Sequence, residues 1–321
     1  MQSKITLSLA IPVFNGADKL KKQFKRIFSE CDNKKFKNFL EVLISDNAST
    51  DDTRKVVSYF KKKSNKKKNI KITYYRKKKN EGVLKNIIGL TKLVKGKYIL
   101  FSNDDDLPTK GYYNEIYSEI YNKNFKEMCI APIHNSRKYY HGLFGKNIIS
   151  YVVSRGSIFS GIILNTKYIK YKSYLKTLYP QVELFLDYYI NHGMKDLNMN
   201  STINNIDSQK RHEKFDDRVQ RGKDYAFLGR INILEKFLKK NKIDFFQFFI
   251  AFYHQYKWGL QIKFILRQEK AFKLENIFYR EIIKIERKKL LTLIIFLIFV
   301  KNFFSKKMFF YLEAFKIKLL N

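Results

Sequence analysis

Three consecutive carboxylates, Asp104, Asp105 and Asp106, are the side chains of this sequence best suited to hold a cation. They follow the apolar run Tyr98–Phe101, which predicts a short buried strand. Adjacent like charges disfavour one another unless an opposite charge lies close by. Carboxylates hold Mg²⁺ or Mn²⁺ through one or two oxygens, and substrate phosphates complete the shell. The alternative is an acidic turn that caps the next helix, since Asp is common there.

Strands alternate with amphipathic helices ahead of this triplet and must position it. The apolar patterns predict strands over residues 5–13, 40–45, 70–75 and 98–101, with helices over 18–29, 53–60 and 84–94. The lysine-rich run 61–68 is typical of a solvated loop. Repeated strand–helix units favour a parallel sheet with right-handed crossovers. The expected fold class is therefore α/β, a mostly parallel, Rossmann-like sheet flanked by helices, with a helical C-terminal extension.

Each predicted strand ends in a polar cluster. The clusters are Asn15, Asp46–Asp52, Asn80–Gly82 and Asp104–Asp106. The carboxyl ends of parallel strands lie at one edge of the sheet, where open α/β folds bind their ligands. Four polar loops at that edge predict a binding site.

These clusters carry a resemblance to a known family. Ile11–Asn15, Asp46–Thr53, Asn80–Gly82 with Asn86, and Asp104–Asp106 are similar in order and spacing to the motifs of GT-A glycosyltransferases of family 2. Within that family the chain most resembles abequosyltransferase-like enzymes of bacterial surface-polysaccharide assembly, which have a segment like Phe159–Ile163. The resemblance implies a GT-A fold and transfer of a sugar from a nucleoside-diphosphate donor to a hydroxyl. Inversion and a divalent metal, Mn²⁺ or Mg²⁺, are implied with it.

The resemblance also implies roles for single residues. Asp46 would meet the nucleobase, and Asp104 and Asp106 would be the outer pair of an Asp-x-Asp motif. Asp104 would face the ribose or the metal, Asp106 would bind the metal, and His212 could complete the shell. Turn chemistry explains Asp46 and the glycine loop as well, and a His in a charged loop is commonly just exposed. The donor-binding residues implied are Pro12, Phe14, Asn15, Asp46, Asn80, Gly82, Asn86, Asp104 and Asp105.

A general base is expected beyond the triplet, because the acceptor hydroxyl must lose a proton as it attacks. In the family resembled, the base is an acidic residue of the later half. Glu183 and Asp187 qualify, four residues apart on one face of a helix that Pro180 starts. The family's frequent Glu-Asp pair is absent here, and both carboxylates could equally lie on an amphipathic surface. Glu183 is favoured because it is nearer the helix start.

The charge balance is strongly basic. The chain has 64 Lys and Arg against 29 Asp and Glu, a formal net charge of +35, which favours an anionic partner. AT-rich codons, which encode Lys, Asn, Ile, Phe and Tyr, explain part of this excess. The alternative function is a basic protein that binds nucleic acid or a sugar nucleotide without transfer. An acidic triplet argues against nucleic acid, and nucleotidyl transfer would need a glycine-rich loop where only Gly16 stands.

The expected partners are thus a nucleoside-diphosphate sugar and a glycan or lipid-linked glycan acceptor, with no nucleic acid. Residues 1–223 are expected to form the glycosyltransferase domain, with a nucleotide-binding half (1–107) and an acceptor half (108–223). Residues 224–321 form a basic, aromatic-rich helical region. Its apolar run Leu290–Val300 is shorter than the about 20 residues that span a bilayer. Basic flanks suit an interfacial helix on anionic lipid, and a buried helix of a bundle explains the run equally well.

Two features of the sequence favour a location in the cytoplasm: its few cysteines and its first residues. Cys31 and Cys129 have no metal-like spacing and predict no disulfide framework. The first residues lack the long apolar core of a signal peptide. We expect a cytoplasmic protein, peripheral on the inner face of the cell membrane if the C-terminal helix binds lipid.

Overall fold

The computed structural model describes residues 5–133, 148–157, 159–169, 180–205, 226–252 and 254. The chain divides into two compact units, residues 1–260 and 261–321, and the described residues all belong to the first. Within them, a seven-stranded sheet has the order β3-β2-β1-β4-β7-β6-β8. A small two-stranded sheet pairs β5 (Asp106–Pro108) with β9 (Ile203–Asn205).

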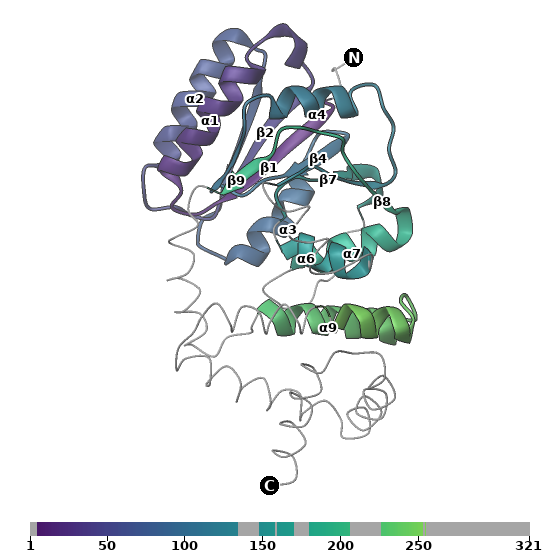
Figure 1. Cartoon of the computed structure of the whole chain (residues 1–321). Coiled ribbons are helices and arrows are strands. Elements are labelled where there is room, and N and C mark those ends of the chain that lie inside the picture. Colours follow the sequence, from purple (N-terminus) through teal and green to yellow (C-terminus); the bar gives the residue numbers. More distant parts are fainter. Residues whose placement is uncertain are drawn as a thin grey trace. The chain divides into compact units, whose positions relative to one another are not determined.

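The first four strands of the large sheet are parallel. They are β1 (Leu7–Val13), β2 (Leu40–Asp46), β3 (Lys71–Arg76) and β4 (Tyr98–Phe101). Helices α1 (Ala17–Cys31) and α2 (Thr53–Lys67) cover one face of the sheet, and α3 (Val83–Leu93) covers the other (Figure 1). The strand order therefore reverses between β1 and β4. This arrangement confirms the predicted α/β class.

The sheet core follows from strand geometry, because successive side chains point to opposite faces. Leu9 and Ile11 of β1 join one buried cluster with α1 and α2, while Ala10 joins the other cluster. All seven residues of β2 are buried. A parallel strand covered on both faces is expected to be apolar nearly throughout, as β1 is, whereas β2 also buries Glu41, Ser45 and Asp46.

The second half adds three strands to the large sheet, of which only β7 runs opposite to β1–β4. β7 (Ile162–Asn165) is antiparallel to β4, β6 (Met128–Ile130) is antiparallel to β7, and β8 (Met194–Asp196) is parallel to β6. Short 3₁₀ turns lie at Lys34–Phe36 and Thr166–Tyr168.

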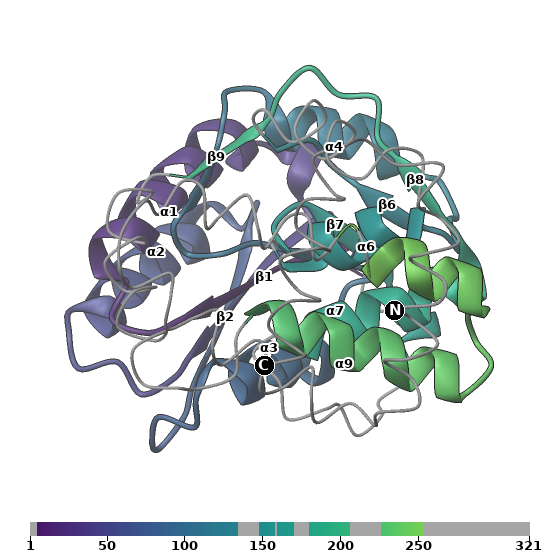
Figure 2. The same ribbon diagram turned by 60° about the horizontal axis from the view of Figure 1, so that its bottom comes forward.

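Helix α4 (Tyr112–Ile120) packs on the α1 side of the sheet. The opposite face carries α3 together with α6 (Ile148–Ser157), α7 (Pro180–His192) and α9 (Ala226–Lys239), as Figure 2 shows. Residues 245–252 are also helical. Helix α9 shares this buried cluster with α7, whereas the boundary predicted at residue 223 stays a prediction.

The lysine-rich run 61–68 is not the loop that was predicted. It is helical to Lys67, and Lys68 ends α2 in the left-handed region with φ 59°. The physical reason is that lysine is a good helix former when its charge stays in water. Ser64 faces inward within the run, and its hydroxyl donates to the Ile70 carbonyl.

Candidate active site at the carboxyl edge of the sheet

The acidic triplet forms the turn between β4 and β5, beside the point where the strand order reverses. Asp104 lies against the loop that follows β1: a Cβ added to Gly16 would be 2.4 Å from Asp104 Oδ2. Only glycine leaves room for this approach. Open α/β sheets bind ligands in the crevice at such a reversal. The structure therefore brings the triplet and the first loop together, as predicted for a donor site.

Asp106 is held firmly at the end of this turn. Its side chain is 3% exposed, and its Oδ2 accepts from Ser160 Oγ at 2.6 Å and from Asn103 Nδ2 at 2.9 Å. From the other side, Gln23 Nε2 donates to the carbonyls of Asn103 and Asp106. Ser160 and Asn103 therefore donate to the same carboxylate oxygen, Oδ2 of Asp106. Sequence patterns gave no sign of Gln23, which stands on the buried face of α1.

The electrostatics of the turn favour a cation. Burial raises the pKa of Asp104 to about 6, the carboxylates of Asp105 and Asp106 add to the rise, and Lys19 opposes it. Carboxylate oxygens are ligands that suit a hard divalent cation whose remaining ligands are phosphate oxygens. In the part of the chain that the structure describes, no group of three His, Cys, Asp or Glu side chains could hold a metal by itself. Substrate oxygens would have to complete the shell.

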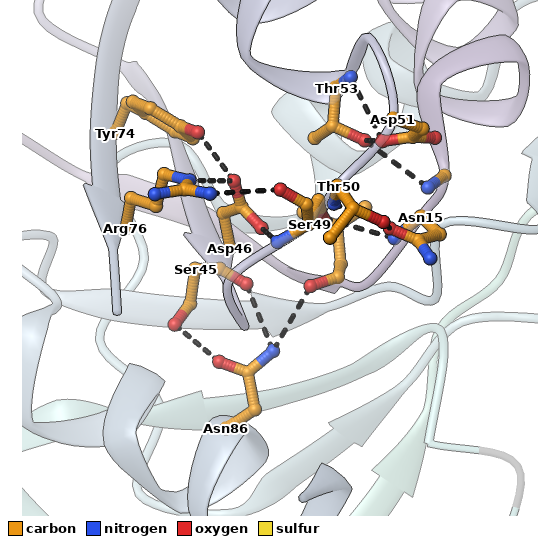
Figure 3. Close-up of polar contacts among 12 residues, drawn as sticks. Asn15, Ser45, Asp46, Ser49, Thr50, Asp51, Thr53, Tyr74, Arg76 and Asn86 are labelled. Carbon is orange, nitrogen blue, oxygen red and sulfur yellow. Dashed lines mark hydrogen bonds and ion pairs between the residues drawn. The ribbon is translucent and has the colours of Figure 1, made fainter. Parts of the chain in front are cut away.

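The loops that follow β1 and β2 are joined by hydrogen bonds (Figure 3). Asn15 N donates to Ser49 Oγ at 3.0 Å, and Asn15 Oδ1 accepts from Thr50 N at 2.8 Å. Gly16 N donates to Thr53 Oγ1 at 3.2 Å. Asn15 has φ 51°, a conformation that Asn adopts more readily than most residues. The two loops form one rigid rim beside the triplet.

Asp46 lies wholly buried below this rim (Figure 3). Its Oδ1 accepts from Ser49 N at 2.8 Å, and its Oδ2 accepts from the Tyr74 hydroxyl at 2.5 Å and lies 3.4 Å from Arg76 Nε. Burial and this hydrogen bond raise the pKa of Tyr74. The Arg76 side chain is 39% exposed and presents the cluster to solvent.

Tyr74 and Arg76 were missed by the sequence analysis. The signal that could have found Arg76 is strand register, because Asp46 is its direct partner across β2 and β3. Tyr74 stands on the same strand two residues earlier. Only the pairing of the strands makes these positions neighbours of an aspartate that is about 30 residues earlier in the chain.

The remaining predicted donor residues divide into exposed and buried ones. Asn80 Oδ1 accepts from Asn47 Nδ2 at 2.6 Å and from Gly82 N at 2.9 Å. Gly82 has φ 85°, which favours glycine, and precedes α3. Asn86 is buried instead, and its Nδ2 donates to the Ser45 carbonyl at 2.9 Å. Asn80 and Gly82 thus reach the exposed edge, while Asn86 ties α3 to β2 beneath it.

Pro12 and Phe14 bracket the end of β1. Pro12 pairs with Ser45 of β2. Proline has no backbone N–H, so this position donates no hydrogen bond to a neighbouring strand. Phe14 is 46% exposed. The exposed face of its ring can stack on a planar base.

The two predicted bases lie on α7 and are both ion-paired. Glu183 is 5% exposed and pairs with Lys236 of α9. Asp187 Oδ1 lies 2.6 Å from Lys242 Nζ. The structure therefore does not present them as two free surface carboxylates. Both pairs join α7 to residues beyond position 226, a connection that the sequence pattern of α7 does not reveal.

His212 and the apolar run Leu290–Val300 lie outside the described residues. Among the helices that are described, none is both long and apolar enough to cross a membrane.

Residues 8–178, more than half of the chain, match glycosyl transferase family 2. This chain belongs to that family. Comparison with curated proteins found no match.

A solved structure of a mannosyltransferase shows the same fold. The chain is similar to the mannosyltransferase PcManGT from Pyrobaculum calidifontis in complex with GDP-Man and Mn²⁺, with 14% identity and a TM-score of 0.57 over 83% of this chain and 72% of that one. It is also similar to S. aureus TarS, with 18% identity and a TM-score of 0.47 over 74% of this chain. The match spans 43% of that TarS chain. The mannosyltransferase likeness confirms the predicted GT-A fold.

Proposed function

We propose that this protein transfers a sugar from a nucleoside-diphosphate donor to a hydroxyl acceptor by direct, inverting displacement. The observation that carries the proposal is the approach of Asp104 to Gly16 at the strand-order reversal. It places an acidic turn next to a rigid rim of polar loops. Membership of glycosyl transferase family 2 supports the reaction type. The mannosyltransferase with the same fold holds GDP-Man and Mn²⁺, which supports this class of donor.

The rim would bind the nucleoside. Phe14 is exposed for stacking on the base, and Arg76 is half-exposed and oriented by Asp46. Asp46 would then act on the base through Arg76 and Tyr74, because all of its carboxylate is buried. Pro12, Asn15, Asn80, Gly82 and Asn86 would shape and support this pocket.

Asp104 would face the ribose or the divalent metal and Asp106 would bind the metal, with Asp105 as a further donor-binding residue. Bound there, a Mn²⁺ or Mg²⁺ ion would neutralise charge on the leaving diphosphate. The chain's own contribution is to keep the carboxylates in place before the donor arrives. Asp106 fits this role because its Oδ2 is fixed by Ser160 and Asn103. His212 is kept as a proposed further ligand.

Glu183 is the proposed general base, with Asp187 as the second candidate. In the structure Glu183 is paired with Lys236 of α9. The same lysine would have to yield when the acceptor hydroxyl enters.

The acceptor is proposed to be a lipid-linked glycan of surface polysaccharide, capsule or lipopolysaccharide synthesis, as in the abequosyltransferase-like enzymes. The basic residues 224–321 would then hold the enzyme at the anionic inner face of the membrane. The split into a transferase domain, 1–223, and this helical region is part of the same proposal.

A ligand screen tests the donor class. Thermal unfolding is recorded with UDP, GDP, CDP, dTDP and their sugars, each with and without MnCl₂. A ligand that binds the native state raises the unfolding temperature by mass action. We expect one nucleoside diphosphate to stabilise the protein more with Mn²⁺ than without. No stabilisation by any of them would contradict the proposed function.

Substitution of Asp106 tests the metal role. Asp106→Ala and the isosteric Asp106→Asn should lower Mn²⁺-dependent donor hydrolysis or transfer by about 10³-fold or more, since the lost charge acts on the leaving group. Asp52→Ala is the matched control, because that aspartate is exposed and pairs only locally with Lys55. Circular dichroism checks that all three variants fold. Wild-type turnover in Asp106→Asn would rule out this role.

A further inference from the structure

The acidic turn is held by a residue that arrives from the other half of the fold. Ser160 is completely buried, and its hydroxyl accepts from Asn103 N at 2.7 Å and donates to Asp106 Oδ2 at 2.6 Å. One hydroxyl thereby joins the main chain at the start of the turn to the carboxylate at its end. Its single proton and one of its two acceptor lone pairs are used.

A second buried side chain grips the turn from α1. Gln23 is fully buried, and its amide donates to the carbonyls of Asn103 and Asp106, the latter at 2.8 Å. These two hydrogen bonds tie the main chain of the acidic turn to α1. Gly16, the N-cap residue of α1, also lies close to Asp104.

Ser160 is itself fixed by its surroundings. The next residue, Gly161, has φ 83°, donates to the Phe101 carbonyl at 2.9 Å and accepts from Ala131 N at 2.8 Å. The buried Arg155 of α6 donates to the Ser160 carbonyl at 2.5 Å. A Cβ on Gly161 would come within 3.0 Å of the Ala131 carbonyl and of Arg155. The hydroxyl of Ser160 therefore has one position, set by β4, β6 and α6.

We propose that Ser160 and Gln23 are positioning residues that hold the acidic turn in the conformation that binds the metal. This inference rests on the proposed function. Three adjacent carboxylates repel one another, so the turn would spread without partners on both sides. Side chains that orient metal ligands typically contribute 10- to 100-fold to metal affinity. Ser160 and Asn103 both donate to Asp106 Oδ2, which fixes the orientation of this carboxylate, while Gln23 holds the main chain of the turn.

Metal titration of the full chain tests the proposal. MnCl₂ is titrated in the presence of whichever of UDP or GDP stabilises the wild type, and free Mn²⁺ is followed by electron paramagnetic resonance. Ser160→Ala and Gln23→Met should each weaken Mn²⁺ binding about 10-fold or more. Ser150→Ala is the matched control, since Ser150 is equally buried and its hydroxyl lies 2.9 Å from His254 Nδ1 on another face. It should bind Mn²⁺ as the wild type does.

Two further readings separate positioning from general stability. Unfolding temperatures without metal should fall no more for Ser160→Ala than for Ser150→Ala. Nucleotide affinity without Mn²⁺ should be unchanged in Ser160→Ala and Gln23→Met. Wild-type Mn²⁺ affinity in either folded variant, or an equal loss in Ser150→Ala, overturns the proposal. A wild type that binds nucleotide but no Mn²⁺ rejects the metal role itself, and a wild type that binds neither rejects the proposed function.

Discussion

The proposed donor half, residues 1–107, and the proposed acceptor half, residues 108–223, are built by different means. In the donor half, parallel strands end in loops that bind one another through short-range polar contacts, such as Asn15 with Ser49 and Thr50. In the acceptor half, antiparallel and parallel strands mix, and the acidic residues of α7 pair with lysines about 50 residues later. The donor edge is therefore complete within the first 110 residues apart from Ser160. The acceptor half depends on the part of the chain beyond residue 226.

This difference has a consequence for function. A preformed rim loses little conformational entropy on binding a nucleotide, which favours affinity. The carboxylates of Glu183 and Asp187 are instead held by lysines, and these ion pairs can open when an acceptor hydroxyl binds. The proposed donor site is thus largely preformed, whereas the proposed proton transfer by α7 requires an ion pair to open first.

Substitution of the α7 carboxylates should give the largest effect in the acceptor half. Glu183→Gln should lower kcat by about 10²- to 10⁴-fold and leave nucleotide binding unchanged, because a general base acts only in the chemical step. Asp187→Asn is the matched change one helical turn later and should keep most activity. Rates are measured at saturating donor. The reverse pattern would assign the base to Asp187, and full activity in both variants would remove α7 from the chemistry.

Alanine at Gly16 should break the donor edge. Its Cβ would lie 2.4 Å from Asp104 Oδ2 and 2.7 Å from Val13 Cγ2, so the turn or the loop must move. We expect donor affinity to fall about 10-fold or more and the free energy of unfolding to fall by about 1–3 kcal/mol. Calorimetry and urea unfolding measure the two.

Gly89→Ala in α3 is the control for Gly16→Ala. No atom lies within 4 Å of the added Cβ, and the position is helical. This variant should gain about 0.5–1 kcal/mol in stability. Equal behaviour of the two alanine variants would mean that Asp104 does not approach Gly16 as described.

The pH dependence of the donor edge should show opposite signs for stability and for metal binding. The pKa of Asp104 is raised to about 6 from 3.8 in the unfolded chain. Between these values the folded protein holds one more proton, so this group favours folding more as pH falls from 6 toward 4. Metal needs the ionised form, and Mn²⁺ affinity should fall up to about 10-fold per pH unit below 6. Urea unfolding and Mn²⁺ titration over pH 4.5–7.5 test both signs, with Asp104→Asn expected to flatten both.

The smallest effect is expected from the ion pair at the end of α7. Lys242→Met removes a partly buried pair with Asp187 and should cost about 1 kcal/mol of stability. Lys55→Met removes an exposed pair with Asp52 and should change stability very little. Urea unfolding compares them. A loss of several kcal/mol in Lys242→Met would show that residues beyond 226 are essential to the whole unit.

Local patterns predicted the donor half well. The strands at β1, β2 and β4 and the polar clusters after them are visible because apolar runs and turn residues act over a few positions. The error at α2 has the same origin, since a run of lysines looks solvated in sequence whether it is helical or not.

Contacts between neighbouring strands and helices could not be predicted from the sequence. Tyr74 and Arg76 reach Asp46 only through strand pairing, and Ser160 reaches Asp106 only because β7 is inserted antiparallel beside β4. The partner of Glu183 depends on where α9 packs. Such pairings join residues whose separation in sequence carries no periodic signal.

Anomalous diffraction from crystals grown with MnCl₂ and the nucleoside diphosphate that stabilises the protein tests the central claim most directly. The account predicts a manganese peak between the diphosphate and the acidic turn, about 2.0–2.3 Å from a carboxylate oxygen of Asp106. Ser160 should still donate to Asp106 Oδ2. Nucleotide bound at this edge with no manganese beside Asp106, or manganese held elsewhere in the fold, would contradict it.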